Sequence, residues 1–452
     1  MNKIVIVGAG EIGMFLAERL TAEQIEVTVI DRDPDVLSKL QNTMDVAGVL
    51  GNATSIRDLT EAGVGGAELF IATTRQDETN LIACLLAREL KVPHTIAVTR
   101  YLGLRGQVQQ LNRQALNIDL LVNSSEAVKN EVMEIIETSG ASEVARFAEG
   151  RIILIGYQVP ETKGVAWRTV GELCANGEQP RFSVAGIVRA NELIEHGESS
   201  RLEPDDYLYI ITTAEHMPAL NDVLAVETLK TRNAVIFGDN FLSQILATAL
   251  LSRHFHVTML AATEEKAQFL KEHFKGRHAF QVETGSGTEV KLLRRVKVPS
   301  TSVFIASNTD DAANLTACMI AKALGVGKTI ATIRRTDILP LCRRAGVDVN
   351  VAPRLATAKV IQKVVHENRV LDYRAVSQTN LEVIEVVAKA GSKAVKSAVK
   401  SLRLPKGAII GAIASEVSAS LPTPDARIQP DDKVIVLTLP EHLLEVEAFF
   451  AD

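Results

Sequence analysis

The segment Lys3–Gly13, with the sequence KIVIVGAGEIG, decides the fold of this chain. Its apolar half predicts a buried strand, and the glycines at 8, 10 and 13 predict a tight turn that opens a helix. The next apolar run, IEVTVID, ends on Asp31, 18 residues after Gly13. Strand, glycine-rich turn, helix and acid-tipped strand together form the fingerprint of a nucleotide-binding βαβ unit. We therefore predict a Rossmann-type domain that binds an adenine nucleotide.

Each position of this fingerprint has a physical role. Gly8 permits the tight turn, Gly10 lets the backbone approach a phosphate, and Gly13 allows the helix to pack closely on the strand. The helix N-terminus offers N–H groups to the anion. Asp31 accepts hydrogen bonds from ribose hydroxyls, and its charge repels a 2′-phosphate, which favours NAD or an ATP-type ligand over NADP. The alternative is a nucleotide fold that has lost its ligand. The predicted binding residues of these two segments are Gly8, Ala9, Gly10, Glu11, Ile12, Gly13, Asp31 and Arg32.

A third candidate segment is the turn Gly51–Thr54, which follows the predicted strand AGVL. It lies at the carboxyl edge of the predicted sheet, where ligands of doubly wound folds bind. Asn52 and Ala53 are therefore predicted to line the site. The alternative is an ordinary strand-to-helix turn in which Thr54 caps the helix.

Two further segments follow the fourth and fifth predicted strands. Thr73 and Thr74 either face the ribose and phosphate or cap the next helix, which carries the candidate binding residues Asp77 and Asn80. Arg100 ends the strand TIAVTR and either reaches a phosphate with its planar donor fork or forms a surface ion pair.

The opening segment recurs, much altered, about 230 residues later. IVIVGAGEIGMFLAERL corresponds to AVIFGDNFLSQILATAL, and IATTRQDETNLIACLLAREL corresponds to IASNTDDAANLTACMIAKAL. RLEPDDYLYIITT likewise corresponds to RIQPDDKVIVLTL, each a turn with Pro and paired Asp before an apolar strand. The chain is therefore predicted to be a tandem duplication. Paired positions include Gly8 and Gly238, Asp77 and Asp311, Asn80 and Asn314, Cys84 and Cys318, Arg100 and Arg334, and Asp119 and Asp348.

Each half is predicted to hold an α/β domain with a doubly wound parallel sheet, followed by a small α+β domain. Strand and helix patterns alternate from Lys3 to about Val122, whereas the region from about Arg151 to Thr213 reads as short strands with one helix. An amphipathic helix, from Ser125 to about Ser139, is predicted to link domains or to pair with another subunit. The predicted domains are 1–124 (first Rossmann-type domain), 125–228 (linker helix and first small domain), 229–352 (second Rossmann-type domain, with a degenerate site) and 353–452 (linker helix and second small domain).

The second copy departs from the fingerprint. It has Asn240 and Ser243 in place of the second and third glycines, and Ala261 stands opposite Asp31. The two polar side chains would crowd a phosphate, and Asp239 would repel it. The second copy is therefore predicted either to be a vacant structural copy or to hold a relaxed mononucleotide site. The relaxed site would use Arg334 and the turn Gly285–Thr288.

The bulk composition is that of a globular, aliphatic-rich protein. A net charge of −6 supplies no positive field for a nucleic-acid backbone, so no nucleic-acid partner is expected. The four cysteines show no metal-ligand spacing, which predicts buried structural thiols in a reducing compartment and no metal site. Because no secretory signal or membrane-spanning run is found, we expect a cytoplasmic protein that reaches a membrane only through a partner.

No set of residues suggests catalysis. A dehydrogenase needs a proton-transfer residue that faces the nicotinamide. His196 lies in a polar predicted loop, His254 and His256 lie beside a strand of the degenerate copy, and Cys84 and Cys318 lie on the apolar faces of matching helices. We therefore predict that the chain is not an enzyme and keep an NAD-dependent oxidoreductase as the alternative.

Taken together, these motifs resemble the TrkA family, the cytoplasmic regulatory subunits of Trk potassium-uptake systems. The resemblance rests on the glycine-rich turn with Asp31, the GNAT turn at 51–54, the TTRQDETN segment at 73–80 and the duplicated LEPDD and IQPDD turns. It implies that the Rossmann-type domains are RCK (also called KTN) N-lobes and that the small domains are RCK C-lobes. It also implies a homotetramer whose eight RCK units form a gating ring beneath a potassium-conducting membrane subunit.

The same resemblance implies that NAD(H) or ATP/ADP binds the first lobe as a regulatory ligand. Such a ligand changes the state of the transporter only if it binds the two ring states with different affinity. The GNAT turn replaces the more usual GDA-type turn of the family. A nucleotide-sensing regulator of a different cation transporter is a further alternative.

Overall fold

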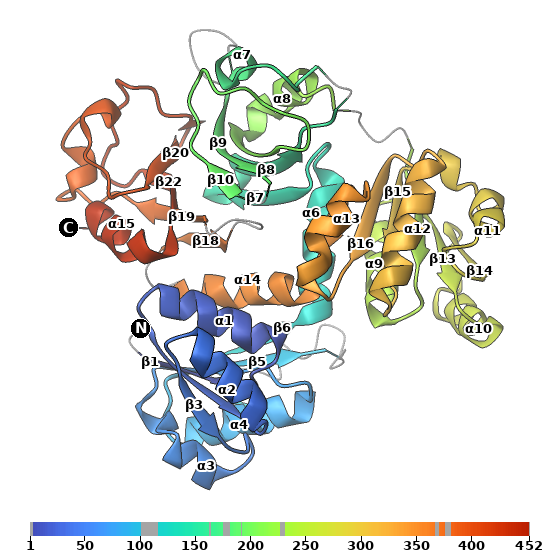
Figure 1. Cartoon of the computed structure of the whole chain (residues 1–452), viewed down its shortest axis with the longest axis horizontal. Helices are drawn as coiled ribbons and strands as arrows, with labels where there is room; N and C mark the ends of the chain where they lie inside the picture. The colour runs from blue at the N-terminus through green and yellow to red at the C-terminus, as the bar shows by residue number, and fades with distance from the viewer. Residues whose placement is uncertain are drawn as a thin grey trace. The chain divides into compact units, whose positions relative to one another are not determined.

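The computed structural model describes residues 3–100, 116–161, 164–174, 181–190, 192–226, 231–366, 370–375 and 381–451. These residues form four β-sheets with their helices (Figure 1). Their contacts divide the chain into two compact units. One unit is Met1–Ala127 with Pro353–Asn368 and Pro440–Leu444, and the other is Val128–Ala352 with Arg369–Leu439 and Glu445–Asp452.

The first half begins with a six-stranded parallel sheet in the order β3-β2-β1-β4-β5-β6, blue in Figure 1. The strand order reverses between β1 and β4, which is the switch point where doubly wound sheets bind ligands. The strands are β1 Lys3–Val7, β2 Glu26–Asp31, β3 Ala47–Leu50, β4 Leu69–Ala72, β5 His94–Thr99 and β6 Leu120–Asn123. The helices are α1 Glu11–Ala22, α2 Pro34–Thr43, α3 Ile56–Glu61 and α4 Asp77–Glu89.

Helices cover both faces of this sheet, which explains why β1 is apolar at successive positions rather than at alternate ones. Ile4 and Ile6 belong to the apolar core on one face, together with residues of α1 and α2. Val5 and Val7 belong to the core on the other face, together with residues of α4. Successive side chains of β1 point to opposite faces of the sheet, and both faces are buried.

A helix from the second half of the sequence completes this first unit. The helix α14, Pro353–His366, packs against α1 (Figure 1). Its residues Ala358, Ile361 and Val365 are part of the same apolar core as Leu16 of α1. The first Rossmann-type domain therefore includes a segment that lies more than 200 residues further along the chain.

The second half repeats the parallel sheet, in the order β14-β13-β12-β15-β16-β17. The strands are β12 Asn233–Phe237, β13 His256–Ala261, β14 Phe280–Thr284, β15 Val303–Ala306, β16 Lys328–Thr332 and β17 Val349–Val351. The helices are α9 Phe241–Ser252, α10 Glu264–His273, α11 Val290–Arg295, α12 Asp311–Ala323 and α13 Leu339–Arg344. The predicted tandem duplication of a doubly wound parallel sheet is confirmed.

The duplication extends to single hydrogen bonds. Asp119 accepts a hydrogen bond of 2.7 Å from the backbone N–H of Thr95, and Asp348 accepts one of 2.8 Å from Thr329. Cys84 and Cys318 are both fully buried in their apolar cores, so the prediction of core packing is confirmed for this pair. Cys342 is also buried, but Cys174 is only half-buried, so the prediction of a buried thiol is wrong there.

Each half also contains a small five-stranded antiparallel sheet, in the orders β10-β9-β11-β8-β7 and β18-β19-β22-β20-β21. The strands of the first are β7 Glu143–Phe147, β8 Ile152–Gln158, β9 Phe182–Arg189, β10 Glu192–Ile194 and β11 Tyr207–Thr213. Those of the second are β18 Asp372–Ala375, β19 Glu382–Val387, β20 Ile409–Ala414, β21 Ala419–Ser420 and β22 Lys433–Thr438. The remaining helices are α6 Ser124–Glu137, α7 Val170–Cys174, α8 Met217–Val223 and α15 Leu443–Phe450. Small antiparallel domains after each parallel sheet agree with the predicted fold class.

The two small sheets share one apolar core. Leu154 and Tyr209 of the first sheet and Val383 and Ile435 of the second belong to the same buried cluster. The duplicated Pro-Asp-Asp turns precede the central strand of each sheet, and their Asp205 and Asp431 adopt the same left-handed backbone, with φ of 67° and 70°. The two small domains therefore form a single packed body.

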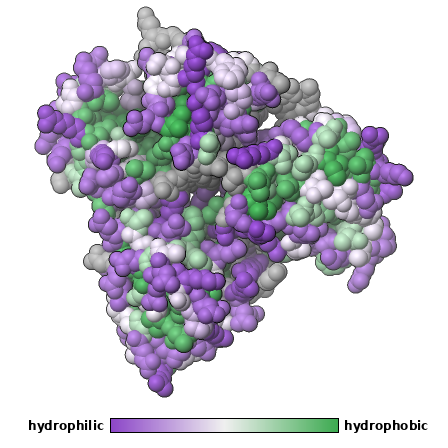
Figure 2. Space-filling view, viewed as in Figure 1, coloured by the Kyte–Doolittle hydropathy of each residue, from purple (hydrophilic) through white to green (hydrophobic). Residues whose placement is uncertain are grey.

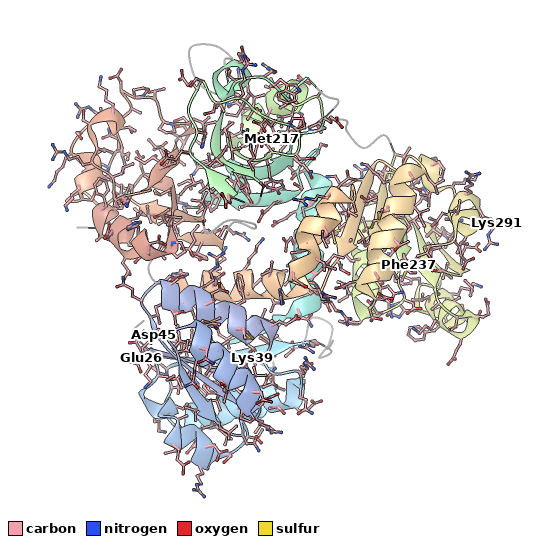
Figure 3. All side chains as sticks on the ribbon, viewed as in Figure 1. Glu26, Lys39, Asp45, Met217, Phe237 and Lys291 are labelled. Carbon is pink, nitrogen blue, oxygen red and sulfur yellow. The ribbon has the colours of Figure 1, made fainter. Side chains whose placement is uncertain are left out.

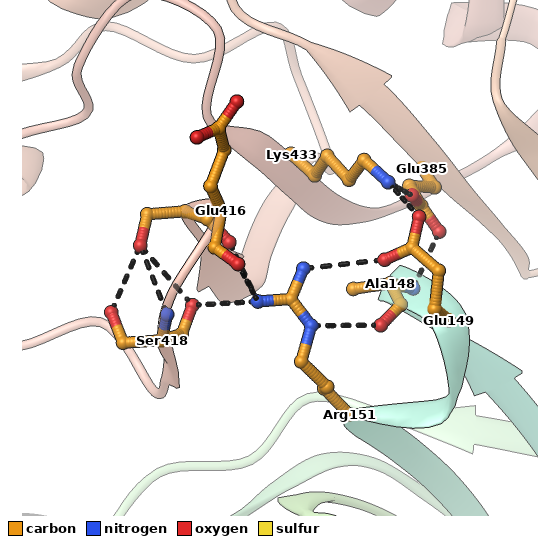
Figure 4. A network of polar contacts seen from close by, with 8 residues as sticks. Ala148, Glu149, Arg151, Glu385, Glu416, Ser418 and Lys433 are labelled. Carbon is orange, nitrogen blue, oxygen red and sulfur yellow. Dashed lines mark hydrogen bonds and ion pairs between the residues drawn. The ribbon is translucent and has the colours of Figure 1, made fainter.

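A polar network closes the edge of this shared core (Figure 4). The guanidinium of Arg151, the residue before β8, donates to the carbonyl oxygens of Ser415, Glu416 and Ser418 at 2.6, 3.3 and 3.3 Å. On the other side of the turn, Glu385 accepts a hydrogen bond of 2.8 Å from the backbone N–H of Ala148. Main-chain groups of each sheet thus find partners in the other sheet.

On the face drawn in Figure 2, apolar areas lie between hydrophilic residues. Within the described ranges, no helix combines the length and the apolar character needed to cross a lipid bilayer.

Candidate nucleotide site

Two glycines of the fingerprint are required by close approach of the backbone. Gly8 has a φ of +95°, and an added Cβ would lie 2.9 Å from the backbone nitrogen of Thr74. At Gly13 an added Cβ would lie 1.9 Å from the carbonyl oxygen of Gly8. The roles predicted for these two positions, a tight turn and a close contact of helix with strand, agree with this geometry.

Gly10 differs from its two neighbours because it is not needed for packing. It is exposed, its φ is −73°, and an added Cβ would meet no atom within 4 Å. Gly10 is also the N-cap of α1, and no side chain of the described residues caps this helix end. The first N–H groups of α1 therefore have no side-chain cap among the described residues, which is the arrangement that accommodates an anion.

The carboxylate of Asp31 joins the ends of β1 and β2. One oxygen accepts a hydrogen bond of 2.6 Å from the backbone N–H of Ala9, and the other accepts one of 3.0 Å from the backbone N–H of Asp33. The side chain remains half-buried at the mouth of the glycine-rich turn. Asp31 therefore holds the turn in place and leaves a negatively charged group at the position expected for the ribose.

Arg32 and Asn52 meet beside Asp31. The guanidinium of Arg32 donates to the Oδ1 of Asn52, which also accepts hydrogen bonds of 3.0 Å from the backbone N–H and the hydroxyl of Thr54. Ala53 in the same turn is buried. Two segments that are 20 residues apart thus form one wall of the site.

The helix α3 after this turn is capped by Ser55, whose hydroxyl accepts from the backbone N–H of Asp58 at 3.2 Å. The alternative in which Thr54 is the N-cap is therefore wrong. Asp58 also accepts a hydrogen bond of 2.7 Å from the backbone N–H of Asn52. This backbone donor, together with the hydroxyl of Ser55, lowers the pKa of the Asp58 carboxyl. Sequence reasoning missed Ser55 and Asp58, although their S-x-x-D spacing is a capping-box signal.

Thr73, Thr74 and Asn80 fasten the end of β4 to its neighbours. The hydroxyl of Thr73 donates to the carbonyl oxygens of Val7 and Gly8, both at 3.0 Å. The Oδ1 of Asn80 accepts from the N–H and the hydroxyl of Thr74 at 2.9 and 2.6 Å, and its Nδ2 donates to the carbonyl of Val98 at 2.8 Å. These side chains therefore hold the rear of the turn.

Asp77 has a similar role at the end of β5. Its buried carboxylate accepts two hydrogen bonds of 3.0 Å from the backbone N–H of Arg100. In the second copy Asp311 accepts from Arg334 at 3.0 and 3.1 Å. The carboxylate of Asp77 thus holds the backbone at Arg100. The second copy, which lacks the glycine fingerprint, makes the same contact between Asp311 and Arg334.

One residue near the site comes from far along the sequence. The guanidinium of Arg354, in the first turn of α14, lies 3.5 Å from the carboxylate of Glu11, in the first turn of α1. No local sequence pattern could have predicted this contact, because 343 positions separate the two residues.

In the second copy, side chains fill the corresponding turn. Asn240 caps α9, with its Oδ1 accepting hydrogen bonds of 3.0 and 3.1 Å from the backbone N–H and the hydroxyl of Ser243. Its Nδ2 donates to the carbonyl of Ser307 at 2.5 Å. The helix end that is open at Gly10 is therefore satisfied internally at Asn240.

The charges around this second turn are also rearranged. Asp239, which corresponds to Ala9, accepts a hydrogen bond of 2.9 Å from the backbone N–H of Ala262 and pairs with Lys266 at 2.7 Å. An added Cβ at Gly287 would lie 2.4 Å from the ring of Phe237, a residue labelled in Figure 3. The candidate turn Gly285–Thr288 therefore lies directly against this ring.

The remaining candidate chemistry is limited. Among the described residues, no group of His, Cys, Asp and Glu is arranged to hold a metal ion. Burial raises the pKa values of the Cys84 and Cys318 thiols, which keeps them protonated and poor nucleophiles.

The TrkA-N domain family matches residues 4–123 and 234–353, and the TrkA-C domain family matches residues 383–451. The Trk system potassium uptake protein TrkA of Vibrio alginolyticus is 27% identical, with 99% of this chain and 98% of that protein covered. The Trk system potassium uptake protein TrkA homolog of Archaeoglobus fulgidus is also 27% identical, over 99% of this chain and all of that protein. The family resemblance seen in the motifs is confirmed.

Solved structures are similar over nearly the whole chain. The GsuK RCK domain aligns with a TM-score of 0.59 at 18% identity, covering 99% of this chain and 95% of that one. The GsuK channel bound to NAD aligns with a TM-score of 0.58 at 18% identity, covering 99% and 79%. The tandem RCK fold is thereby confirmed.

Proposed function

This chain belongs to the TrkA family, and from that premise we propose that it regulates a Trk-type potassium-uptake system by binding NAD(H) or ATP/ADP in its first Rossmann-type domain. The relatives that match over their full length carry potassium-uptake names. A structural neighbour of the whole chain is a channel that binds NAD. Both observations support a role in regulating potassium flux.

The observation that carries the proposal is the difference between the two glycine-rich turns. At Gly10 the end of α1 is open and uncapped, and Asp31 lies at its mouth. At Asn240 the equivalent end of α9 is capped by a side chain. We infer one regulatory nucleotide per chain, in the first domain, and a structural role for the second.

Within the first site we distinguish two groups of predicted residues. The backbone of Gly8–Gly13 receives the phosphates, and Asp31, Arg32 and Asn52 face the ribose and base side. Thr73, Asp77 and Asn80 hold the turn and the neighbouring strand ends by the bonds described above, which makes them positioning residues.

The assembly proposed with this function is a homotetramer that forms a ring on a membrane potassium-conducting subunit. It would lie at the cytoplasmic face of the membrane. The division of the chain at residues 124, 228 and 352 into two RCK N-lobes and two RCK C-lobes is part of the same proposal. For regulation, the nucleotide must bind the two ring states with different affinity.

A titration panel tests the ligand. NADH, NAD, ATP and ADP are titrated by calorimetry into the full chain, and we expect one site per chain for those that bind. The nucleotide recovered afterwards should be chemically unchanged, because a regulator does not turn it over. Oxidation or reduction of the nicotinamide with an added small substrate would favour the oxidoreductase alternative.

Affinity purification from native membranes tests the partner. Under the proposal, a potassium-conducting membrane subunit is recovered with the chain, and adding nucleotide changes potassium flux in vesicles that hold both. Recovery of a different cation transporter would support the alternative of a regulator of another system.

A further inference from the structure

The helices α1 and α14 run side by side in the same direction. Arg354 of α14 pairs with Glu11 of α1 at 3.5 Å, and His366 of α14 lies 3.2 Å from Glu23, just after α1. His366 lies 12 residues after Arg354, and Glu23 lies 12 residues after Glu11, which corresponds to about 18 Å of helix. The two helices are therefore in register over the whole length of α1.

The His366–Glu23 end of this contact is buried, and the Arg354–Glu11 end is partly exposed. The side chains of His366 and Glu23 are each only 1% exposed, whereas those of Arg354 and Glu11 are 21% and 55% exposed. Between the two pairs, Ala358, Ile361 and Val365 lie in the core of the first sheet. The position of α14 therefore does not depend on the Arg354–Glu11 pair.

The carboxylate of Glu11 would compete with a bound phosphate for the positive end of α1. It lies in the first turn of α1, where the partial positive charge of the helix end favours an anion. A phosphate bound at the N–H groups of that turn would repel the Glu11 carboxylate and attract the Arg354 guanidinium. An arginine has five N–H donors and can reach a phosphate with two of them.

We propose that Arg354 is a phosphate-binding residue of the first-domain site, which exchanges Glu11 for the nucleotide when the site fills. This inference rests on the proposed function, since it adds a residue to the same site. Arg354 lies three residues after Val351, the last residue of β17 in the second Rossmann-type sheet. The exchange thus connects the phosphates to the segment of chain that leaves the second sheet.

Calorimetry with four probes tests the inference: ATP, ADP, NADH and adenosine, which lacks phosphate. For Arg354→Gln we expect a loss of affinity of about tenfold to a hundredfold for ATP and ADP, because a charge-assisted hydrogen bond is lost. Binding of adenosine should be unchanged. Lys363→Gln is the matched control, a second cation on α14 about 13 Å further along the helix.

Glu11→Gln provides an independent test, because it removes the competing carboxylate and should increase the affinity for ATP severalfold. If Arg354→Gln does not fold, this second variant alone decides: tighter binding supports the inference, and unchanged binding overturns it. Equal affinities of the original chain and Arg354→Gln for ATP would overturn the inference while leaving the proposed function intact. If the original chain binds no nucleotide, the proposed function fails, and the inference fails with it.

Discussion

The carboxylate of Asp31 accepts a hydrogen bond of 2.6 Å from the backbone N–H of Ala9, across the ends of two neighbouring strands. The second copy makes a related connection, with the carboxylate on the other segment. There the carboxylate of Asp239, at the position of Ala9, accepts from the backbone of Ala262 at 2.9 Å. The link between the strand ends is thus preserved, while the carboxylate moves from the end of β2 in the first copy to the turn after β12 in the second.

Asp31→Ala should weaken nucleotide binding and leave the fold intact. The substitution removes a charged acceptor of Ala9 and the predicted partner of the ribose, so we expect the dissociation constant to rise by about tenfold to a hundredfold. Calorimetric titration with NADH and ADP measures the effect, and far-UV circular dichroism controls for folding. Unchanged affinity would remove Asp31 from the site.

Gly10→Ala and Gly13→Ala should separate binding from stability. At Gly10 a methyl group meets no protein atom, so the variant should unfold at the same temperature but bind nucleotide more weakly. At Gly13 the methyl group would lie 1.9 Å from the oxygen of Gly8, so α1 must move and the protein should be destabilised by about 1 to 3 kcal/mol. Thermal unfolding with and without ADP measures both. A destabilised Gly10→Ala variant that retains full affinity would contradict the description of the open turn.

Asn240→Ala should destabilise the second half without creating a nucleotide site. Loss of the helix cap costs about 1 kcal/mol, and no carboxylate stands opposite Asp31 to bind a ribose. Thermal unfolding measures the cost. Titration in the Asp31→Ala background tests the site, and strong ADP binding there would show that the second copy can hold a nucleotide.

Arg151→Ala should loosen the shared core of the two small sheets. The guanidinium donates to the carbonyl groups of Ser415, Glu416 and Ser418, and we expect a loss of about 1 to 2 kcal/mol when these hydrogen bonds are removed. Val417→Ala in the same turn is the control, because its side chain is 92% exposed and should cost less than about 0.5 kcal/mol. Denaturant unfolding followed by hydrogen exchange in β8 and β20 compares them, and equal stability of the two variants would argue against the network.

The stability of the second half should rise with pH between about 8 and 10.5. Burial lowers the pKa of Lys328 to about 8, where its ammonium donates to the carbonyls of Ile135 and Ala141 at 3.3 and 3.0 Å. Between that value and the ordinary 10.5, the unfolded chain holds a proton that the folded chain has lost, so raising the pH favours folding. Below about 8 both states are protonated and this contribution is absent.

The gain over this pH range should be roughly 2 to 3 kcal/mol in the original chain and should vanish in Lys328→Met. Unfolding by urea at pH 7.5 and 10 measures it. Lys275→Met is the control, since Lys275 is exposed and pairs with Glu272 on the surface. Identical pH dependence in the original chain and Lys328→Met would contradict the assignment.

The sequence predicted the features that depend on neighbours along the chain. The glycine turn at Gly8–Gly13 and the acid at Asp31 follow from strand and helix patterns with a fixed spacing, and the structure contains both. The duplication was equally visible in the matching segments, and in the structure Asp119 and Asp348 make the same backbone contact in each copy. Such local features can be predicted from one sequence, because the residues that form them are close together along the chain.

The sequence could not predict the contacts between segments that lie far apart along the chain. The sequence placed Asn80 near the ligand, but it could not show that the Asn80 amide bonds to Thr74 and to the carbonyl of Val98. Nor could the sequence show that the Asp239 side chain accepts a hydrogen bond from the backbone of Ala262, just after β13.

By itself, then, the sequence determined the two Rossmann-type units, their small antiparallel domains and the family. Only the tertiary structure decided that α14 completes the first unit, that Arg354 meets Glu11, and that the two small sheets bury one core. The physical reason is the same in each case. A periodic pattern tells which face of a helix or sheet must be buried, but the segment that covers it is selected by shape and charge across hundreds of residues.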